Sequence, residues 1–139
     1  LRYFNVFGPR QSPTNPYSGV ISIFIDHARR GQSPTIFGDG KQTRDFIAVE
    51  DVVQANLAAM ASAKKLGGEA FNVASGRSIS LLDLWAAIQE AAGVKIEPKF
   101  EPARAGDIRH SSASTRKIRD ALDFRPRREF GDAVKALLS

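Results

Sequence analysis

With 139 residues, 42% of them hydrophobic and 25% charged, the chain has the size and composition of one globular domain rather than of a disordered protein. The net charge of +5 favours an anionic partner. The basic residues form no continuous stripe interleaved with aromatic residues, however, so we expect no nucleic-acid partner. Cysteine is absent, and no apolar run approaches the roughly 20 residues of a membrane span. These features exclude a disulfide framework and predict a cytoplasmic protein without a membrane partner.

The first part of the chain predicts a strand followed by a helix. The apolar and aromatic run over residues 1–7 predicts a buried strand, which the turn residues at 8–10 end. Because this run starts at the first residue without an initiator methionine, we expect the chain to be a piece of a longer protein. Two prolines predict an extended loop over residues 11–18. Apolar residues at helical spacing then predict a helix over 20–30, with Gly31 as its stop.

The middle of the chain alternates between strands and a helix. Residues 35–37 and 43–49 have the composition of short strands. Acidic residues from Glu50 onward favour a helix start, and this helix is expected to end near Gly67. Residues 70–74 predict the next strand.

The last part of the chain adds three helices and one strand. Ser80 begins a capping box, and Gly93 is the expected end of the helix that follows it. Residues 96–100 predict a short strand. Ser114 is the expected cap of a helix that runs to residue 122, and residues 130–138 predict an amphipathic helix. Alternating strands and helices predict an α/β fold, or α+β for a piece of one.

Four segments carry a family resemblance together. They are R-Y-F-N-V-F-G-P-R at residues 2–10, T-I-F-G-D-G to V-E-D-V at 35–52, F-N-V-A-S-G at 71–76 and R-A-G-D-I-R-H-S at 104–111. Their order and spacing resemble extended short-chain dehydrogenases of the NAD-dependent epimerase/dehydratase family. The last segment is similar to the R-x-G-D-x-R-H-S loop of UDP-sugar 4-epimerases. The resemblance implies that residues 1–139 are the C-terminal sugar-nucleotide-binding region, a Rossmann-type edge with a small substrate-binding subdomain.

The sequence lacks the motifs that carry catalysis in this family. Such enzymes bind NAD through a G-x-x-G-x-x-G loop and use a Y-x-x-x-K pair as acid and base. The glycines here do not form that loop, and neither Tyr3 nor Tyr17 is followed by a lysine four residues later. We therefore expect the NAD-binding Rossmann half to be absent, NAD to bind mainly in that half, and this chain alone to be inactive, without a catalytic residue.

The resemblance also implies a set of residues that bind a UDP-sugar. Arg44 and Arg104 match the arginines that bind the diphosphate, which suits the two-pronged hydrogen bonds of a guanidinium. Asp107 matches a carboxylate that accepts hydrogen bonds, often from ribose hydroxyls, and Asn5 an amide near the sugar and phosphates. The other implied contacts are the uracil-holding residues Val20, Thr35, Ile36 and Phe37, the phosphate neighbour Ser111, and Phe4 beside the nicotinamide cofactor.

Four of these residues also have a purely structural interpretation. Asn5 has the composition of a turn residue at a strand end. Arg44 could pair on the surface with Asp45 or Asp51, an interaction that contributes only about 0–1 kcal/mol. Phe37 could belong to the core, and Arg104 to a loop without a ligand.

The resemblance leaves alternatives for the parent reaction. We expect C4 epimerisation of a UDP-hexose, UDP-glucose or UDP-N-acetylglucosamine, by transient hydride transfer to NAD. A UDP-glucuronate decarboxylase, a dTDP-sugar dehydratase and a non-catalytic UDP-sugar-binding module are the alternatives. Ser114 stands where relatives commonly have aspartate, which weakens the assignment of subtype. Without its missing half, the first strand would expose apolar surface and an unpaired edge, so we expect a homodimer or a self-associating chain.

Overall fold

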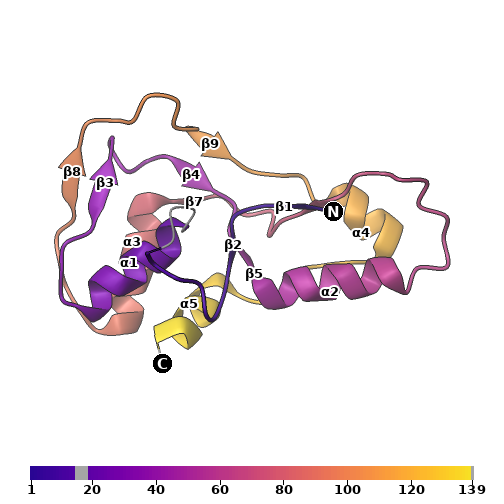
Figure 1. The fold of residues 1–139 in the computed structure, drawn as a ribbon, viewed down its shortest axis with the longest axis horizontal. Helices are drawn as coiled ribbons and strands as arrows, with labels where there is room; N and C mark the ends of the chain where they lie inside the picture. The colour runs from indigo at the N-terminus through magenta and orange to yellow at the C-terminus, as the bar shows by residue number, and fades with distance from the viewer. Residues whose placement is uncertain (15–18, 139) are drawn as a thin grey trace.

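The computed structural model describes residues 1–14 and 19–138, so part of the loop predicted over residues 11–18 lies outside the described residues. Short strands alternate with helices along the chain (Figure 1). The helices are α1 (Val20–Arg29), α2 (Val49–Met60), α3 (Leu81–Ala92), α4 (Arg116–Leu122) and α5 (Phe130–Leu138). The strands are β1 (Arg2–Tyr3), β2 (Val6–Phe7), β3 (Thr35–Phe37), β4 (Thr43–Arg44), β5 (Ile47–Ala48), β6 (Asn72–Val73), β7 (Ile79–Ser80), β8 (Lys99–Glu101) and β9 (His110–Ser111).

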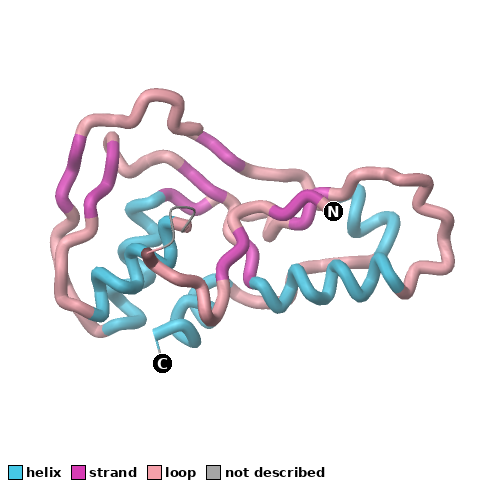
Figure 2. Tube along the Cα trace, in the orientation of Figure 1, coloured by secondary structure: helices cyan, strands magenta, loops and turns pink. Residues whose placement is uncertain are grey.

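One hydrophobic core lies among α1, α3 and α5, and Figure 2 shows α1 and α3 at the left of the view, far from α4 at the right. Phe24 of α1 and Trp85 of α3 meet edge to face, with their ring centroids 5.6 Å apart. The indole N–H of Trp85 donates to the carbonyl of Ile96 at 2.9 Å, so the polar edge of this buried ring is satisfied. Val134 joins α5 to the same core. This core supports the strands that frame the site described below.

A second core joins α2, α4 and β6. Val52 and Ala55 of α2 pack with Val73 of β6 and Ile118 of α4. Each of these side chains is buried. Burial of apolar side chains stabilises the fold by about 1.5–3 kcal/mol for each large one. The second core therefore holds together one end of the molecule, at the right of Figure 1.

The prediction of one continuous strand over residues 1–7 is wrong. β1 pairs in parallel with β6, whereas β2 pairs in parallel with β5. Between them Asn5 adopts φ 25°, and its side-chain amide donates to the carbonyl of Asp45 at 2.9 Å. Asparagine tolerates a positive φ better than most residues do. The chain therefore leaves one partner strand at Asn5 and joins another.

The strand predicted over residues 43–49 is also divided. β4 lies in a three-stranded sheet between β7, to which it is antiparallel, and β9, to which it is parallel. Asp45 and Phe46 separate it from β5, and α2 begins at once after β5. β3 pairs in parallel with β8, and the segment 102–109 that joins β8 to β9 arches over the top of the view in Figure 1.

Helix ends agree with the sequence where a local signal sets them. Ser80 caps α3 by accepting the N–H of Asp83 at 3.1 Å, and Gly93 ends it with φ 67°, as predicted. α2 instead ends at Met60, before Gly67, because the chain there has passed the second core and Met60 is 82% exposed. The prediction of Ser114 as a cap is wrong, since Thr115 precedes α4 and makes no capping bond with its side chain.

The predicted mixture of helices and strands is confirmed. In the described part of the chain, no helix combines the length and the apolar character that crossing a membrane requires.

Candidate functional site

A groove of about 640 Å³ opens between α1, β3, β4 and the segment 102–109. We call it the arginine groove, after the two guanidinium groups that line it. Its apolar wall comes from α1, β3 and the start of α3, and its charged wall comes from β4 and the segment 102–109. The lining residues are Val20, Ile23, Phe24, His27, Thr35, Phe37, Gln42, Arg44, Leu81, Arg104, Ala105, Gly106 and Asp107.

Arg104 of the charged wall and Phe37 of the apolar wall meet in the arginine groove. The guanidinium carbon of Arg104 lies 3.6 Å from the centroid of the Phe37 ring, a cation–π contact. The backbone carbonyl of Phe37 accepts a hydrogen bond from the side chain of Gln42 at 2.7 Å, which fixes the end of β3. A flat cation on an aromatic face thus lies directly beside apolar side chains. That combination suits a ligand with both a ring and an anionic group.

Arg44 belongs to the charged wall and holds the segment 102–109. Its guanidinium donates to a carboxylate oxygen of Asp107 at 2.7 Å and to the carbonyls of Ile108 at 2.5 Å and of Thr43 at 2.9 Å. The Arg44 side chain is only 17% exposed, so the pair with Asp107 is partly shielded from water. The Asp107 oxygen that Arg44 does not contact can accept a hydrogen bond from a ligand hydroxyl.

A second ion pair joins the same segment to the turn after β3. Arg109 donates to both carboxylate oxygens of Asp39, at 2.7 and 2.8 Å. The Arg109 guanidinium and the backbone N–H of Lys41 lower the pKa of Asp39 to about 2. Asp39 therefore stays ionised at neutral pH, and the pair is charged there on both sides.

The structure brings six of the residues implied by the resemblance into the arginine groove and leaves four outside its lining. The six are Val20, Thr35, Phe37, Arg44, Arg104 and Asp107. Ile36 is fully buried in the first core and is not a lining residue. Ser111 lies opposite Arg44 across the β4–β9 pair but is not a lining residue. Asn5 and Phe4 lie near β1, where the backbone N–H of Phe4 donates to the carbonyl of Val73.

The sequence analysis did not predict two polar residues of the groove lining, Gln42 and His27. Gln42 precedes Arg44 by two positions, and residues two apart on a strand share a face. His27 lies seven residues after Val20, so both fall on one face of α1. Those two spacings were the signals that could have found them. The alternative interpretation, in which Arg44 pairs with Asp45 or Asp51, is wrong because Arg44 pairs with Asp107.

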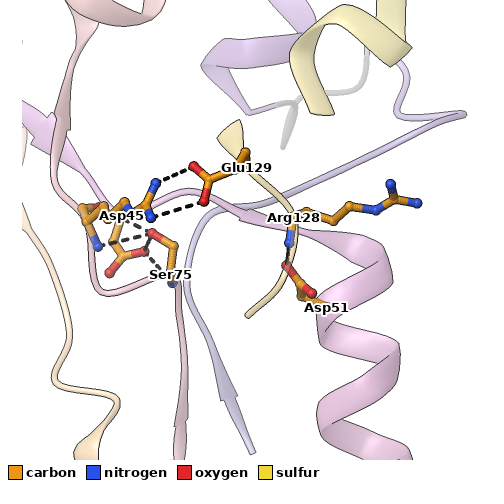
Figure 3. A network of polar contacts seen from close by, with 6 residues as sticks. Asp45, Asp51, Ser75, Arg128 and Glu129 are labelled. Carbon is orange, nitrogen blue, oxygen red and sulfur yellow. Dashed lines mark hydrogen bonds and ion pairs between the residues drawn. The ribbon is translucent and has the colours of Figure 1, made fainter. Parts of the chain in front are cut away.

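Two buried carboxylates, those of Asp45 and Asp51, bind backbone N–H groups of loops, and Figure 3 shows both residues from close by. Asp45 is fully buried and accepts the backbone N–H of Ser75 and its hydroxyl, each at 2.7 Å, and the N–H of Gly76 at 3.0 Å. Asp51 in the first turn of α2 accepts the N–H groups of Arg127 and Arg128 at 2.9 and 3.1 Å. These carboxylates satisfy loop backbone groups and thereby hold the loops that support the site.

In residues 1–14 and 19–138, no three histidine, aspartate or glutamate side chains gather in a way that could hold a metal ion. The guanidinium, aromatic and amide groups that line the arginine groove suit a ligand with an anionic group and a ring.

A known protein family matches this sequence. The profile of the family described as "NAD dependent epimerase/dehydratase family" matches residues 1–74. A UDP-glucose 4-epimerase of Mycolicibacterium smegmatis is 39% identical over 130 residues, which cover 94% of this chain and 41% of that protein. The chain thus spans about two-fifths of the length of this curated relative.

Solved structures have the same fold. The UDP-glucose 4-epimerase of Thermotoga maritima with UDP-glucose superposes with a TM-score of 0.91 at 37% identity, covering 99% of this chain and 43% of that one. The UDP-glucuronic acid 4-epimerase of Bacillus cereus, in complex with UDP-glucuronic acid and NAD, gives a TM-score of 0.90 at 29% identity over 99% of this chain and 42% of that one. The profile match covers more than half of the sequence. On this evidence the chain belongs to the NAD-dependent epimerase/dehydratase family.

Proposed function

We propose that the chain is the sugar-nucleotide-binding part of an NAD-dependent UDP-sugar 4-epimerase. The observation that carries the proposal is the arginine groove, in which two guanidinium groups face an apolar wall that includes Phe37 and Val20. Relatives and structural neighbours named as UDP-sugar 4-epimerases support the same choice. A decarboxylase relative exists too, at 33% identity against 39% for the UDP-glucose 4-epimerase of Mycolicibacterium smegmatis.

Each part of UDP has a matching group in the groove. The diphosphate would bind Arg104 and the guanidinium N–H groups of Arg44 that the protein leaves free. A ribose hydroxyl would donate to the open oxygen of Asp107. The uracil would pack against Phe37 and the apolar face of α1. Asn5, Ser111 and the backbone of Ile36 stay predicted contacts at the ends of the ligand.

NAD, which supplies hydride transfer in such enzymes when it is bound, does not fit the strand-to-helix junctions of this chain. A dinucleotide pyrophosphate needs a helix N-terminus without negative charge. α2, which begins directly after β5, carries Glu50 and Asp51 in its first turn, and α3 carries Asp83 there. We therefore propose that the parent protein holds NAD and its acid–base residues elsewhere, with Phe4 at the border, and that this chain alone catalyses no epimerisation.

Calorimetric titration with UDP tests the groove. We expect saturable one-to-one binding of UDP and at least tenfold weaker binding of uridine, because uridine lacks the diphosphate that the arginines bind. Arg104→Ala should weaken UDP binding, whereas Arg125→Ala, at an exposed arginine away from the groove, should not. Absence of UDP binding by the unmodified chain would refute the proposal. Turnover of a UDP-hexose by this chain with added NAD would refute its predicted inactivity.

Self-association is expected from an apolar surface on the outer side of α2. On α2, Val53 and Leu57 are about half exposed and Met60 is 82% exposed. Tyr3 is 50% exposed and lies beside this helix, since its hydroxyl donates a hydrogen bond to Asn56. Spacing of three and four residues places the three α2 side chains in one row. A contiguous apolar patch of this kind marks a contact surface.

Light scattering at rising concentration tests that surface. We expect the measured mass to exceed that of a monomer, and we expect Leu57→Lys with Met60→Lys to restore the monomer mass. Lys95→Ala, on the loop after α3, is the control that should leave association unchanged. A monomeric mass of the unmodified chain at high concentration would contradict the prediction.

A further inference from the structure

We infer that Asp39 and Arg109 are positioning residues for the arginine groove, and that their ion pair sets the segment 102–109 so that Arg104 and Asp107 face a ligand. We call this ion pair the Asp39–Arg109 clasp. The inference rests on the proposed function, since it concerns UDP binding in the groove.

The segment 102–109 has no buried side chain that could hold it in place. Every residue from 101 to 110 is exposed. Apolar burial is the usual source of loop order, and a loop without it depends on hydrogen bonds and ion pairs. The position of Arg104 and Asp107 therefore depends on the few polar contacts that this segment makes with β3, β4 and the turn between them.

The clasp is anchored on a turn with little freedom. Asp39 lies between Gly38 and Gly40, whose φ values are 80° and 72°, and it accepts the backbone N–H of Lys41 at 3.0 Å. A Cβ at Gly40 would lie 2.8 Å from the side chain of Leu82, so the backbone of this turn packs closely on α3. Two parallel hydrogen bonds from Arg109 then fix direction as well as distance.

The clasp differs from the other ion pair of the segment in its relation to the ligand. Arg44 and Asp107 line the groove, so a bound ligand contacts both members of their pair directly. Asp39 and Arg109 are not lining residues, so a ligand leaves their pair intact. The clasp thus holds the segment from a place that the ligand does not touch.

A double-mutant cycle on UDP affinity tests this role. Asp39→Ala and Arg109→Ala should each weaken UDP binding about fivefold, and the double variant should bind no more weakly than either single one, because one interaction is lost in all three. Arg109→Lys, which keeps the charge but not the two-pronged geometry, should recover part of the affinity. Thermal unfolding of each variant verifies that the fold is kept.

The chain offers a matched control in the Arg77–Glu129 pair. This pair is also two-pronged and similarly exposed, but it lies outside the groove. Arg77→Ala should leave UDP affinity unchanged. If the unmodified chain binds UDP and Arg109→Ala changes the affinity less than about twofold, or if the two losses add, the inference is overturned. If the unmodified chain does not bind UDP, the proposed function fails instead.

Discussion

Asp45→Asn is expected to lower the free energy of unfolding by about 3 kcal/mol. Asp45 is fully buried, and its two oxygens together accept three hydrogen bonds from Ser75 and Gly76. Asparagine has one oxygen in place of two. Whichever way its amide is turned, an NH₂ group faces a backbone N–H, so a buried donor loses its acceptor. Urea denaturation followed by the fluorescence of Trp85, the chain's single tryptophan, measures the change.

Asp120→Asn is the matched control for this prediction. The Asp120 side chain is 61% exposed and, among the described residues, pairs with its neighbour Arg119, so the same substitution should change stability by less than about 0.5 kcal/mol. A loss below about 1 kcal/mol for Asp45→Asn would show that the loop at 75–76 does not depend on this carboxylate. A reduced denaturant slope would instead point to a change in the compactness of one of the two states.

Arg44→Ala is expected to weaken UDP binding about thirtyfold or more, an effect of roughly 2 kcal/mol. The substitution removes a cation from the arginine groove and leaves Asp107 there without its partner, so that an unpaired carboxylate faces the incoming diphosphate. It also removes the tether from Arg44 to the carbonyl of Ile108. Three effects thus act in one direction, whereas Arg104→Ala removes a cation without exposing a carboxylate.

Arg44→Lys separates charge from geometry. Lysine keeps the positive charge but cannot contact a carboxylate and two carbonyls in one plane, so its UDP affinity should lie between those of Arg44→Ala and the unmodified chain. Titration calorimetry measures all three proteins under one salt concentration, because exposed charges are screened by salt. Equal affinity of Arg44→Ala and the unmodified chain would show that the diphosphate binds elsewhere.

Local signals predicted part of the fold correctly. Ser80 caps the start of α3 and Gly93 ends it, as the chemistry of serine and glycine predicts. Residues 130–138 form the helix that their apolar spacing indicates. These features depend on neighbours within four residues, which the sequence displays directly.

The apolar pattern of the sequence could not predict where a strand is interrupted. Residues 1–7 and 43–49 are each apolar enough for one strand, yet each is divided. The division arises because β1 and β2 pair with different strands, β6 and β5, and the exchange needs the positive φ of Asn5. The strands that pair come from distant parts of the chain, so the residues next to a strand in sequence do not indicate its partner.

The arginine groove shows the same division between sequence and structure. The motifs at 35–52 and 104–111 by themselves determined which residue types the groove could use: two arginines, a carboxylate and an aromatic ring. They also indicated the family to which the chain belongs. Tertiary structure alone decided that Arg44 pairs with Asp107, 63 residues away, rather than with its acidic neighbours. It also brought Gln42 and His27 into the groove and kept Ile36 and Asn5 out of its lining. The physical reason is that side-chain chemistry is a property of each residue, whereas an ion pair or a groove depends on how distant strands and loops pack together.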